Sequence, residues 1–323
     1  MSRAVVVTTG SRLHFGLFAH GKSGRREFGG VGVMIDQPGF IVRGSVARFD
    51  QIVCAADWRL RIETVVARLR DRHSPVATLG PLSLELLQSF PAHSGLGSGT
   101  QLAMAVAKVA SVLAGEHEVA AEELARRSGR GLRSALGLYG FQHGGLMVEA
   151  GKTAPDEISP LVARVDLPAP WRFVLARPRR MTGLSGIEEA GGFSRLAPMP
   201  MRTTDRLCRI ALMEILPAAM AHDYSAASES IGQFGRLVGE YFAPVQGGVF
   251  ADERIRRIAD LLAARNIRGV GQSSWGPTLF ILCPDIDFAR SLLDELAPQP
   301  EGADCEFQIA APLNRGATCC EPS

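Results

Sequence analysis

The stretch that decides the fold is Phe90-Pro91-Ala92-His93-Ser94-Gly95-Leu96-Gly97-Ser98-Gly99-Thr100. It lies between an extended run, residues 81–89, and an apolar stretch suited to a helix, residues 101–114. Its alternating glycines can adopt φ > 0 and let a ligand approach the backbone closely. The first N–H groups of the following helix lack intrahelical partners and carry the positive end of the helix dipole. Strand, glycine-rich loop and helix start together predict an anion site, most often one for phosphate.

The loop differs from a P-loop at its end, because the closing Lys-Ser/Thr pair is missing. The alternative to a ligand site is a tight strand-to-helix turn capped by Ser98. We predict that the second part of the stretch binds phosphate, through Ser94, Gly95, Leu96, Gly97, Ser98, Gly99 and Thr100.

Length and composition indicate an ordinary globular chain. Its 323 residues allow two domains or one large one, and 46% hydrophobic and 21% charged residues are typical values. A net charge of +2 gives no basis for a polyanion partner, so we expect no nucleic-acid binding. No apolar run reaches the roughly 18 residues that span a membrane. Because Val5-Val6-Val7 is too short for a signal-peptide core, we expect a cytoplasmic protein without a membrane partner.

The six cysteines are scattered along the chain, with no Cys-x-x-Cys pair. This spacing argues against a zinc site. Reduced thiols in a reducing compartment explain all six.

The order of the expected elements indicates the fold class. Strands are expected at residues 3–9, 31–35, 39–46 and 82–86, with a loop from Gly10 to Gly32, and again at 171–176 and 278–283. Helices are expected at residues 63–72, 101–113, 206–221, 224–240, 252–265 and 286–296. The proline-rich residues 155–170 suggest a boundary between domains 1–160 and 161–323. This order predicts an α+β fold of antiparallel sheets with helices segregated to one side.

A second glycine-rich stretch, residues 268–277, lies between an expected helix and an expected strand. Gln272, Ser273 and Ser274 supply hydrogen-bonding side chains beside its glycines. A ligand-facing loop and a simple connector are both consistent with it. Trp275 either stacks on a ligand or anchors the loop in the core.

The N-terminal segment carries two basic side chains in alternation with apolar ones. Arg12 and His14 alternate with Leu13 and Phe15, so both point to the same face of an extended segment. An arginine and a histidine on one face, beside glycine-rich backbone, suit a phosphate or a carboxylate. A structural role for His14 is the alternative.

A basic triplet follows the expected strand at residues 171–176. Arg177, Arg179 and Arg180 lie beside the Gly183-Leu184-Ser185-Gly186 turn and would suit an anionic group. A solvated basic loop is the equal alternative. We expect Arg179 or Arg180 to hold a substrate carboxylate, with Arg26 as the other candidate.

At these residues the chain resembles the GHMP kinase superfamily. Residues 91–100 resemble its second signature, Pro-x-x-x-Gly-Leu-Gly-Ser-Ser-Ala, and residues 269–277 fall where its third signature lies. Shorter segments are similar to the β-ribofuranosylaminobenzene 5′-phosphate synthase family: Arg12–Leu17, Phe28–Gly32, Arg130-Gly131, Phe141–Gly145, Gly183–Gly186 and Gln246–Gly248. The resemblance implies a two-domain GHMP kinase-like fold. Its N-terminal domain would resemble ribosomal protein S5 domain 2, and its C-terminal domain a ferredoxin-like α/β sandwich.

The resemblance also implies a reaction. The family condenses phosphoribosyl pyrophosphate with 4-aminobenzoate, or a similar para-substituted benzoate, and releases carbon dioxide and pyrophosphate on the way to tetrahydromethanopterin. It implies Mg²⁺, whose ligands are unassigned, and small-molecule partners. Whether the protein forms a homodimer is left open. The implied catalytic residues are Arg12, His14 and His143. The implied substrate-binding residues are Arg26, Gly29, Gly30, Arg179, Arg180, Ser185, Gln246, Gln272, Ser273, Ser274 and Trp275.

One departure from the kinase pattern bears on activity. The kinases often carry an aspartate general base after a Pro-Ser-Gly turn, and Gly137 occupies that position here. Phosphoryl transfer to an alcohol would lose its usual base. An ATP-dependent small-molecule kinase is therefore the second hypothesis, and a non-catalytic ligand sensor is the third, since a fold alone does not decide function.

Overall fold

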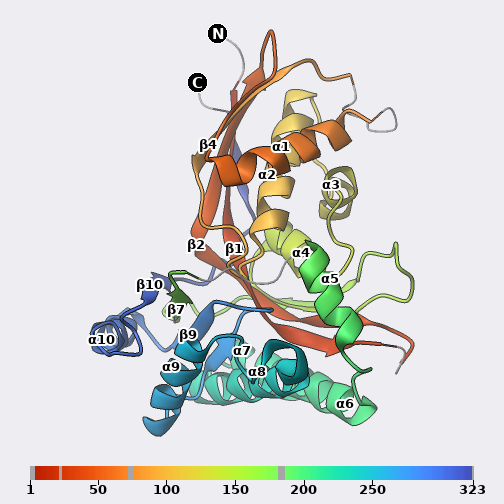
Figure 1. The fold of residues 1–323 in the computed structure, drawn as a ribbon. Coiled ribbons are helices and arrows are strands. Elements are labelled where there is room, and N and C mark those ends of the chain that lie inside the picture. The colour runs from red at the N-terminus through yellow and green to blue at the C-terminus, as the bar shows by residue number, and fades with distance from the viewer. Residues whose placement is uncertain (1–3, 22–23, 72–75, 77, 181–185, 322–323) are drawn as a thin grey trace.

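Two long antiparallel strands, β1 (Ala4–Ala19) and β2 (Phe28–Val46), form the backbone of the first sheet (Figure 1). The computed structural model describes residues 4–21, 24–71, 76, 78–180 and 186–321. The strand order is β11-β1-β2-β4-β3, and β5 pairs with β2 and carries β6 at its other side. The remaining strands of this sheet are β3 (Gln51–Val53), β4 (Leu82–Gln88), β5 (Leu146–Glu149), β6 (Leu161–Val165) and β11 (Thr318–Cys320).

Four helices follow strands of this sheet: α1 (Ala56–Leu69), α2 (Ser98–Leu113), α3 (Ala121–Ser128) and α4 (Leu136–His143). Helix α2 is buried along nearly its whole length and packs on β1 and β2, with α1 and α3 against its other side. Small residues allow this close approach. A Cβ atom on Gly44 of β2 would lie 2.4 Å from Cγ1 of Val109, which no side chain can tolerate.

The second sheet is antiparallel, in the order β10-β7-β9-β8, with bounds β7 (Arg172–Pro178), β8 (Val270–Gln272), β9 (Leu279–Cys283) and β10 (Cys305–Ala310). Its part of the chain also contains α5 (Gly186–Arg195), α6 (Met201–Ile210), the short π-helix η1 (Ala211–Ile215), α7 (Leu216–Met220), α8 (Tyr224–Gln246), α9 (Glu253–Ala264) and α10 (Ile286–Leu296). Helix α8 packs on both β8 and β1 and so joins the two sheets (Figure 1). None of the described helices is both long and apolar enough to cross a membrane.

One continuous apolar core runs through both halves of the molecule. The rings of Phe15 on β1 and Phe280 on β9 lie 5.0 Å apart, between their centroids, and both side chains are buried. The α+β fold is confirmed, and its sheets are antiparallel except for the parallel pair of β3 and β4. The expected boundary at residue 160 lies between β5 and β6, which pair in one sheet.

The expected loop from Gly10 to Gly32 is wrong, because β1 continues to Ala19 and β2 begins at Phe28. Five of its glycines are strand residues at points of close packing: Gly10, Gly16, Gly29, Gly30 and Gly32. A Cβ on Gly16 would meet the side chain of Val238 on α8 at 2.4 Å. Glycine inside a strand here indicates close approach rather than a turn.

Gln101, which is fully buried at the start of α2, joins three elements. The hydroxyl of Thr9 lies 2.5 Å from its Oε1, and its amide donates to the carbonyl of Gly137 at 2.7 Å. Gln101→Leu leaves both partners unsatisfied, so we expect about 1–3 kcal/mol less free energy of unfolding in urea denaturation. The exposed Gln88→Leu is the matched control. Equal effects of the two substitutions would contradict this role.

Candidate functional site

The glycine-rich loop forms a concave backbone turn that ends in α2. His93, Gly95 and Gly97 have φ angles of 59°, 78° and 71°, and Gly97 is the residue before the helix. Alternating left-handed residues turn successive N–H groups toward one point and make an anion-binding nest. The free N–H groups and the dipole of α2 add to the same positive potential. This backbone has the geometry that the glycine spacing predicts.

Strand β1 binds this loop through its backbone. The N–H of Arg12 donates to the carbonyl of Leu96 at 2.9 Å. The N–H of His14 donates to Oγ of Ser273 at 3.0 Å, and that hydroxyl donates to the carbonyl of Gly95 at 2.7 Å. The first and second glycine-rich stretches therefore meet on β1, with His14 between them.

The side chains nearest the nest are arginines. A Cβ atom on Gly97 would lie 3.3 Å from Nε of Arg12. A Cβ atom on Gly99 would lie 3.0 Å from both Nη1 of Arg61 and Nη2 of Arg130. Guanidinium groups match phosphate oxygens in geometry and charge. The loop therefore presents backbone N–H groups and is lined by cationic arginine side chains.

An aromatic cavity of about 90 Å³ opens beside Arg12. Four aromatic side chains from four segments contribute to it, on β2, α5, α8 and the second glycine-rich stretch. Its volume is smaller than the roughly 150 Å³ of a cavity known to bind one benzene ring. We call this space the aromatic pocket; its lining residues are Arg12, His14, Gly16, Leu17, Phe28, Gly29, Arg133, Ser134, Phe193, Phe242, Ser274 and Trp275.

The aromatic side chains of the pocket pack on one another. The Phe193 and Trp275 rings meet edge to face at 5.1 Å between centroids, and Phe242 lies 4.3 Å from Trp275. Trp275 is buried and also lines the pocket, so it anchors its loop and forms part of the pocket wall. This wall fits a flat aromatic molecule.

His14 is a buried, uncharged histidine in this setting. Burial, and then the nearby charge of Arg12, lower the pKa of His14 well below its usual 6.5. Its Nδ1 is buried and has no hydrogen-bond partner among the described residues. His14 thus offers the pocket a neutral imidazole with an unused ring nitrogen.

Glu149 is a buried carboxylate beneath the pocket. It accepts hydrogen bonds from Oγ of Ser134 and from the N–H of Ala135, both at 2.7 Å. Burial raises its pKa, while these two hydrogen bonds and the charge of Arg12 oppose the change. Glu149 thereby holds the turn that carries Arg133 and Ser134 at the pocket.

The second glycine-rich stretch is held by two glutamines. The amide of Gln246 donates to the carbonyls of Gly248 and Val249, both at 2.9 Å. Gln272 accepts from the N–H of Ala251 at 2.7 Å and donates to Oε1 of Gln246 at 3.3 Å. These amides fix the loops around the aromatic pocket.

Other residues predicted from sequence lie apart from this pocket. His143 is exposed at the last position of α4, the end away from Gly137. Arg26 donates to the carbonyl of Gly151 at 2.9 Å and lies 3.8 Å from Glu157. Arg179 is exposed and paired with Glu306 at 3.6 Å, and Arg180 beside it is also exposed. Ser185 lies outside the described residues, while Gly29 lines the pocket and Gly30 follows it in β2.

The residues around the nest do not form a cage for a divalent metal. The described part of the chain contains no group of three histidine, cysteine or acidic side chains close enough to share an ion. The side chains that lie next to Gly97 and Gly99 belong to arginines and are cationic. Mg²⁺ is typically held by carboxylates together with substrate phosphates. At this site it would therefore enter as the counterion of a phosphate ligand.

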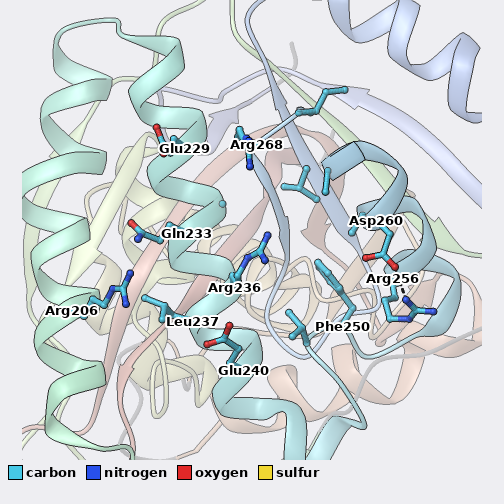
Figure 2. Close-up of a pocket in the computed structure, with 16 residues that line it drawn as sticks. Arg206, Glu229, Gln233, Arg236, Leu237, Glu240, Phe250, Arg256, Asp260 and Arg268 are labelled. Carbon is cyan, nitrogen blue, oxygen red and sulfur yellow. Dashed lines mark hydrogen bonds and ion pairs between the residues drawn. The ribbon is translucent and has the colours of Figure 1, made fainter. Parts of the chain in front are cut away.

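A larger cavity, of about 700 Å³, lies between α8 and α9 (Figure 2). None of the predicted site residues lines it. Arg236, Glu240 and Phe250 are among the side chains drawn around it, and Arg256 is paired there with Asp260. It is an open groove lined by charged side chains of both signs, and it lacks the aromatic wall of the other pocket.

Several residues of the site were missed in the sequence analysis: Arg61, Arg130, Arg133, Ser134, Glu149, Phe193 and Phe242. Glu149 had a readable signal, since an acidic residue ends the apolar strand Leu146-Met147-Val148. The others stand on helices and turns far apart in the chain, where only tertiary packing reveals the site.

The lowered pKa of His14 gives a stability prediction. The unfolded chain takes up a proton below pH 6.5 that the folded His14 does not. Stability should therefore fall as the pH drops below 6.5, by up to about 1.4 kcal/mol per pH unit for this one proton. His14→Gln should flatten that slope in urea unfolding between pH 7.5 and 5.5, and the exposed His143→Gln should not. An unchanged slope in His14→Gln would contradict a buried neutral imidazole.

Comparison with known proteins gives the family. Residues 61–144 match the family model of the GHMP kinases N terminal domain. The sequence is 31% identical to a beta-ribofuranosylphenol 5'-phosphate synthase of Methanothermobacter thermautotrophicus, over 97% of this chain and 98% of that protein. It is 29% identical to the protein of the same name from Archaeoglobus fulgidus, over 95% and 97%.

Solved structures show the same fold at low sequence identity. Mevalonate diphosphate decarboxylase from Staphylococcus aureus has a TM-score of 0.69 at 14% identity, over 99% of each chain. Homoserine kinase from Cytophaga hutchinsonii has a TM-score of 0.68 at 12% identity, over 98% of this chain and 97% of that one. A further structure, a complex with MVAPP, AMPPCP and magnesium, has a TM-score of 0.67 at 14% identity, over 100% of this chain and 99% of that one. The GHMP kinase-like fold expected from sequence is confirmed, and the near full-length match shows that this chain belongs to the beta-ribofuranosylphenol 5'-phosphate synthase family of the GHMP kinase superfamily.

Proposed function

We propose that this chain joins phosphoribosyl pyrophosphate to a para-substituted benzoate, with loss of carbon dioxide and pyrophosphate. The observation that supports this most directly is the contact between two unlike sites. An aromatic pocket adjoins a cationic phosphate nest, and Arg12 and His14 lie between them. A sugar phosphate fits the nest and a flat aromatic acid fits the pocket.

The name of the relatives suggests the para substituent. A ribofuranosylphenol phosphate has a hydroxyl group on the ring, and decarboxylating ribosylation of 4-hydroxybenzoate would give it. We propose 4-hydroxybenzoate and 4-aminobenzoate as the two substrates to compare, because the aromatic wall accommodates either ring.

The reaction sets the orientation of the ring in the pocket. The carbon that carries the carboxylate is the carbon that bonds to C1 of the ribose. The carboxylate must therefore face the nest, next to Arg12 and Arg133, and the para substituent must point toward the aromatic wall. Arg133 lines this pocket, whereas Arg26 and Arg179 interact elsewhere. We therefore propose Arg133, with Arg12, as the carboxylate anchor.

The bond changes balance without an added base. The C1–oxygen bond of the ribose breaks, and its electron pair leaves with pyrophosphate. The ring carbon supplies the pair for the new carbon–carbon bond. The ring then loses carbon dioxide, and the electrons of that bond restore aromaticity. Because carbon dioxide leaves in place of a proton, the site needs no aspartate where Gly137 stands.

The chain's own groups supply binding and electrostatics. The nest N–H groups and Arg12 bind the leaving pyrophosphate and stabilise its growing charge. The aromatic wall orients the ring toward C1 and excludes water. His14 is neutral there, so it adds a hydrogen-bonding nitrogen without attracting the carboxylate away from the reacting carbon.

The proposed function is tested with purified protein, phosphoribosyl pyrophosphate and Mg²⁺. Carboxyl-labelled 4-hydroxybenzoate and 4-aminobenzoate are supplied separately, and labelled carbon dioxide is counted. Release that depends on the ribosyl donor supports the proposal. No release from either acid, with intact folded protein, rejects it.

Gly97→Val should abolish donor binding by filling the nest. The residue has φ of 71°, and its Cβ would meet Arg12 at 3.3 Å. We expect affinity for phosphoribosyl pyrophosphate to fall at least tenfold in calorimetry, about 1.4 kcal/mol. Gly80→Val, at an exposed position with open space, is the control. A folded variant with normal donor affinity would contradict the assignment of the nest.

Arginine-to-lysine substitutions locate the carboxylate anchor. Lysine keeps the charge but loses the planar fork, so Arg133→Lys should raise the KM for the benzoate several-fold with donor affinity unchanged. Arg179→Lys should leave both unchanged, because Arg179 is paired with Glu306. If Arg179→Lys alone raises the benzoate KM, then Arg179 binds the carboxylate, as predicted from sequence, and Arg133 does not.

We expect no ATP-dependent kinase activity. Gly137 replaces the usual general base, and a Cβ atom there would make a tight contact, 3.1 Å from Cγ2 of Thr100. A screen of common small alcohols and sugars for ADP formation checks this. Robust turnover of any one of them would favour a kinase over a synthase.

A further inference from the structure

Two arginines from separate elements converge at Gly99 of the nest, and neither lines the aromatic pocket. Arg61 stands on α1, and Arg130 stands in the turn after α3. One guanidinium nitrogen of each lies 3.0 Å from the point where a Cβ of Gly99 would be. The two nitrogens therefore lie over the first turn of α2, and the distance between them is at most twice that value.

The backbone and neighbouring rings fix these arginines in place. The guanidinium of Arg61 lies over the ring of Trp58, 5.4 Å from its centroid, and contacts Nε2 of His93 at 2.6 Å. The N–H of Arg130 donates to the carbonyl of Ala125 at 2.7 Å. Arg68 lies behind them, against the backbone of Gly129.

The charges of this cluster find no balancing carboxylate in the part of the chain that the structure describes. Within the described ranges, no carboxylate forms an ion pair with Arg61, Arg68 or Arg130. Burial, and then repulsion from Arg61, Arg68 and Arg133, lower the pKa of Arg130. Like charges held together without a counterion destabilise the free protein, and a bound anion would relieve that repulsion.

The position of the cluster relative to the pocket suggests its ligand. Arg12 adjoins Gly97 and lines the aromatic pocket, whereas Arg61 and Arg130 adjoin Gly99 and do not line it. Pocket, Arg12 and the pair Arg61–Arg130 thus follow one another along the loop. Displacement at C1 of the ribose places the attacking ring and the departing group on opposite sides of that carbon. The departing group therefore extends from Arg12 toward Arg61 and Arg130.

We propose that Arg61 and Arg130 form a distal phosphate subsite that binds the terminal phosphate of the leaving pyrophosphate. The inference rests on the proposed function, and it adds a second set of residues to the nest. A phosphate oxygen accepts from a guanidinium at about 2.7–2.9 Å, so one phosphate group can bridge the two arginines over Gly99. Negative charge on this phosphate increases as the C1–oxygen bond breaks. The subsite therefore acts on catalysis as well as on binding.

The other source of the same chemistry is the 5′-phosphate of the ribosyl donor. Inorganic pyrophosphate and ribose 5-phosphate are the two probes that separate these sources. Calorimetry measures the affinity of each for the folded protein, in the presence of Mg²⁺ and without any benzoate. Arg61→Gln and Arg130→Gln are the test variants. Arg59→Gln on α1 and Arg126→Gln on α3 are matched controls, because Arg59 lies 3.9 Å from Glu63 and Arg126 pairs with Glu123.

We expect each test variant to bind pyrophosphate at least tenfold more weakly and ribose 5-phosphate as the wild type does. The controls should bind both normally. Loss of ribose 5-phosphate binding alone would assign the cluster to the 5′-phosphate and overturn the proposal. Normal binding of pyrophosphate, or an equal loss of both probes, would overturn it as well.

Two further measurements keep the result interpretable. Arg61→Lys and Arg130→Lys keep the charge, so they should recover part of the pyrophosphate affinity even if a glutamine variant fails to fold. If the wild-type protein binds pyrophosphate but releases no labelled carbon dioxide, the proposed function fails while the distal subsite stands. If it releases carbon dioxide and the variants bind pyrophosphate normally, only the subsite fails.

Discussion

The site depends on the way in which the backbone of β1 joins two glycine-rich segments that are far apart in the chain. Arg12 binds the first segment through Leu96, and His14 binds the second through Ser273 and Ser274. Ser273 in turn donates to Gly95 of the first segment. Buried backbone groups must find partners, so the segments can close on β1 only in this arrangement. The phosphate nest, the neutral His14 and the rim of the aromatic pocket all result from it.

The same arrangement explains why this superfamily member has cations where a metal-dependent phosphotransferase would need acids. Arg12, Arg61 and Arg130 surround the loop, and the buried Glu149 is committed to the turn of Ser134 and Ala135. Carboxylates at those positions would repel a phosphate ligand unless a metal lay between them. Arginines bind it directly, in a fixed planar geometry.

The sequence predicted those parts of the site that are encoded locally. Glycine spacing before a helix indicated the nest, and the alternation of Arg12 and His14 placed both on one face of β1, where both line the aromatic pocket. It did not predict Phe193 and Phe242, because these rings come from α5 and α8 and meet Trp275 only after the two halves pack. Nor did it propose Arg133 as the carboxylate anchor, since it named Arg179 or Arg180 instead. Both Arg133 and Arg179 lie near glycine turns, and only the structure shows that Glu149 supports the turn of the first while Glu306 pairs with the second.

The distribution of charge across the site suits a reaction in which negative charge moves. In the proposed reaction, the benzoate would carry one negative charge on the pocket side, beside Arg12 and Arg133. Afterwards that charge has left the ring as neutral carbon dioxide forms, and the pyrophosphate has gained charge on the side of Arg61 and Arg130. A site complementary to the transition state should be more cationic where charge accumulates than where it disappears. A single tight clamp on the carboxylate would stabilise the bound substrate more than the transition state and would slow its decarboxylation. This site is arranged in the opposite way. The pocket side has an apolar wall and the uncharged His14, whereas the arginines lie together at the far end of the loop. In the proposed reaction, this arrangement would hold the carboxylate moderately and the leaving group strongly, which is the balance that such chemistry requires.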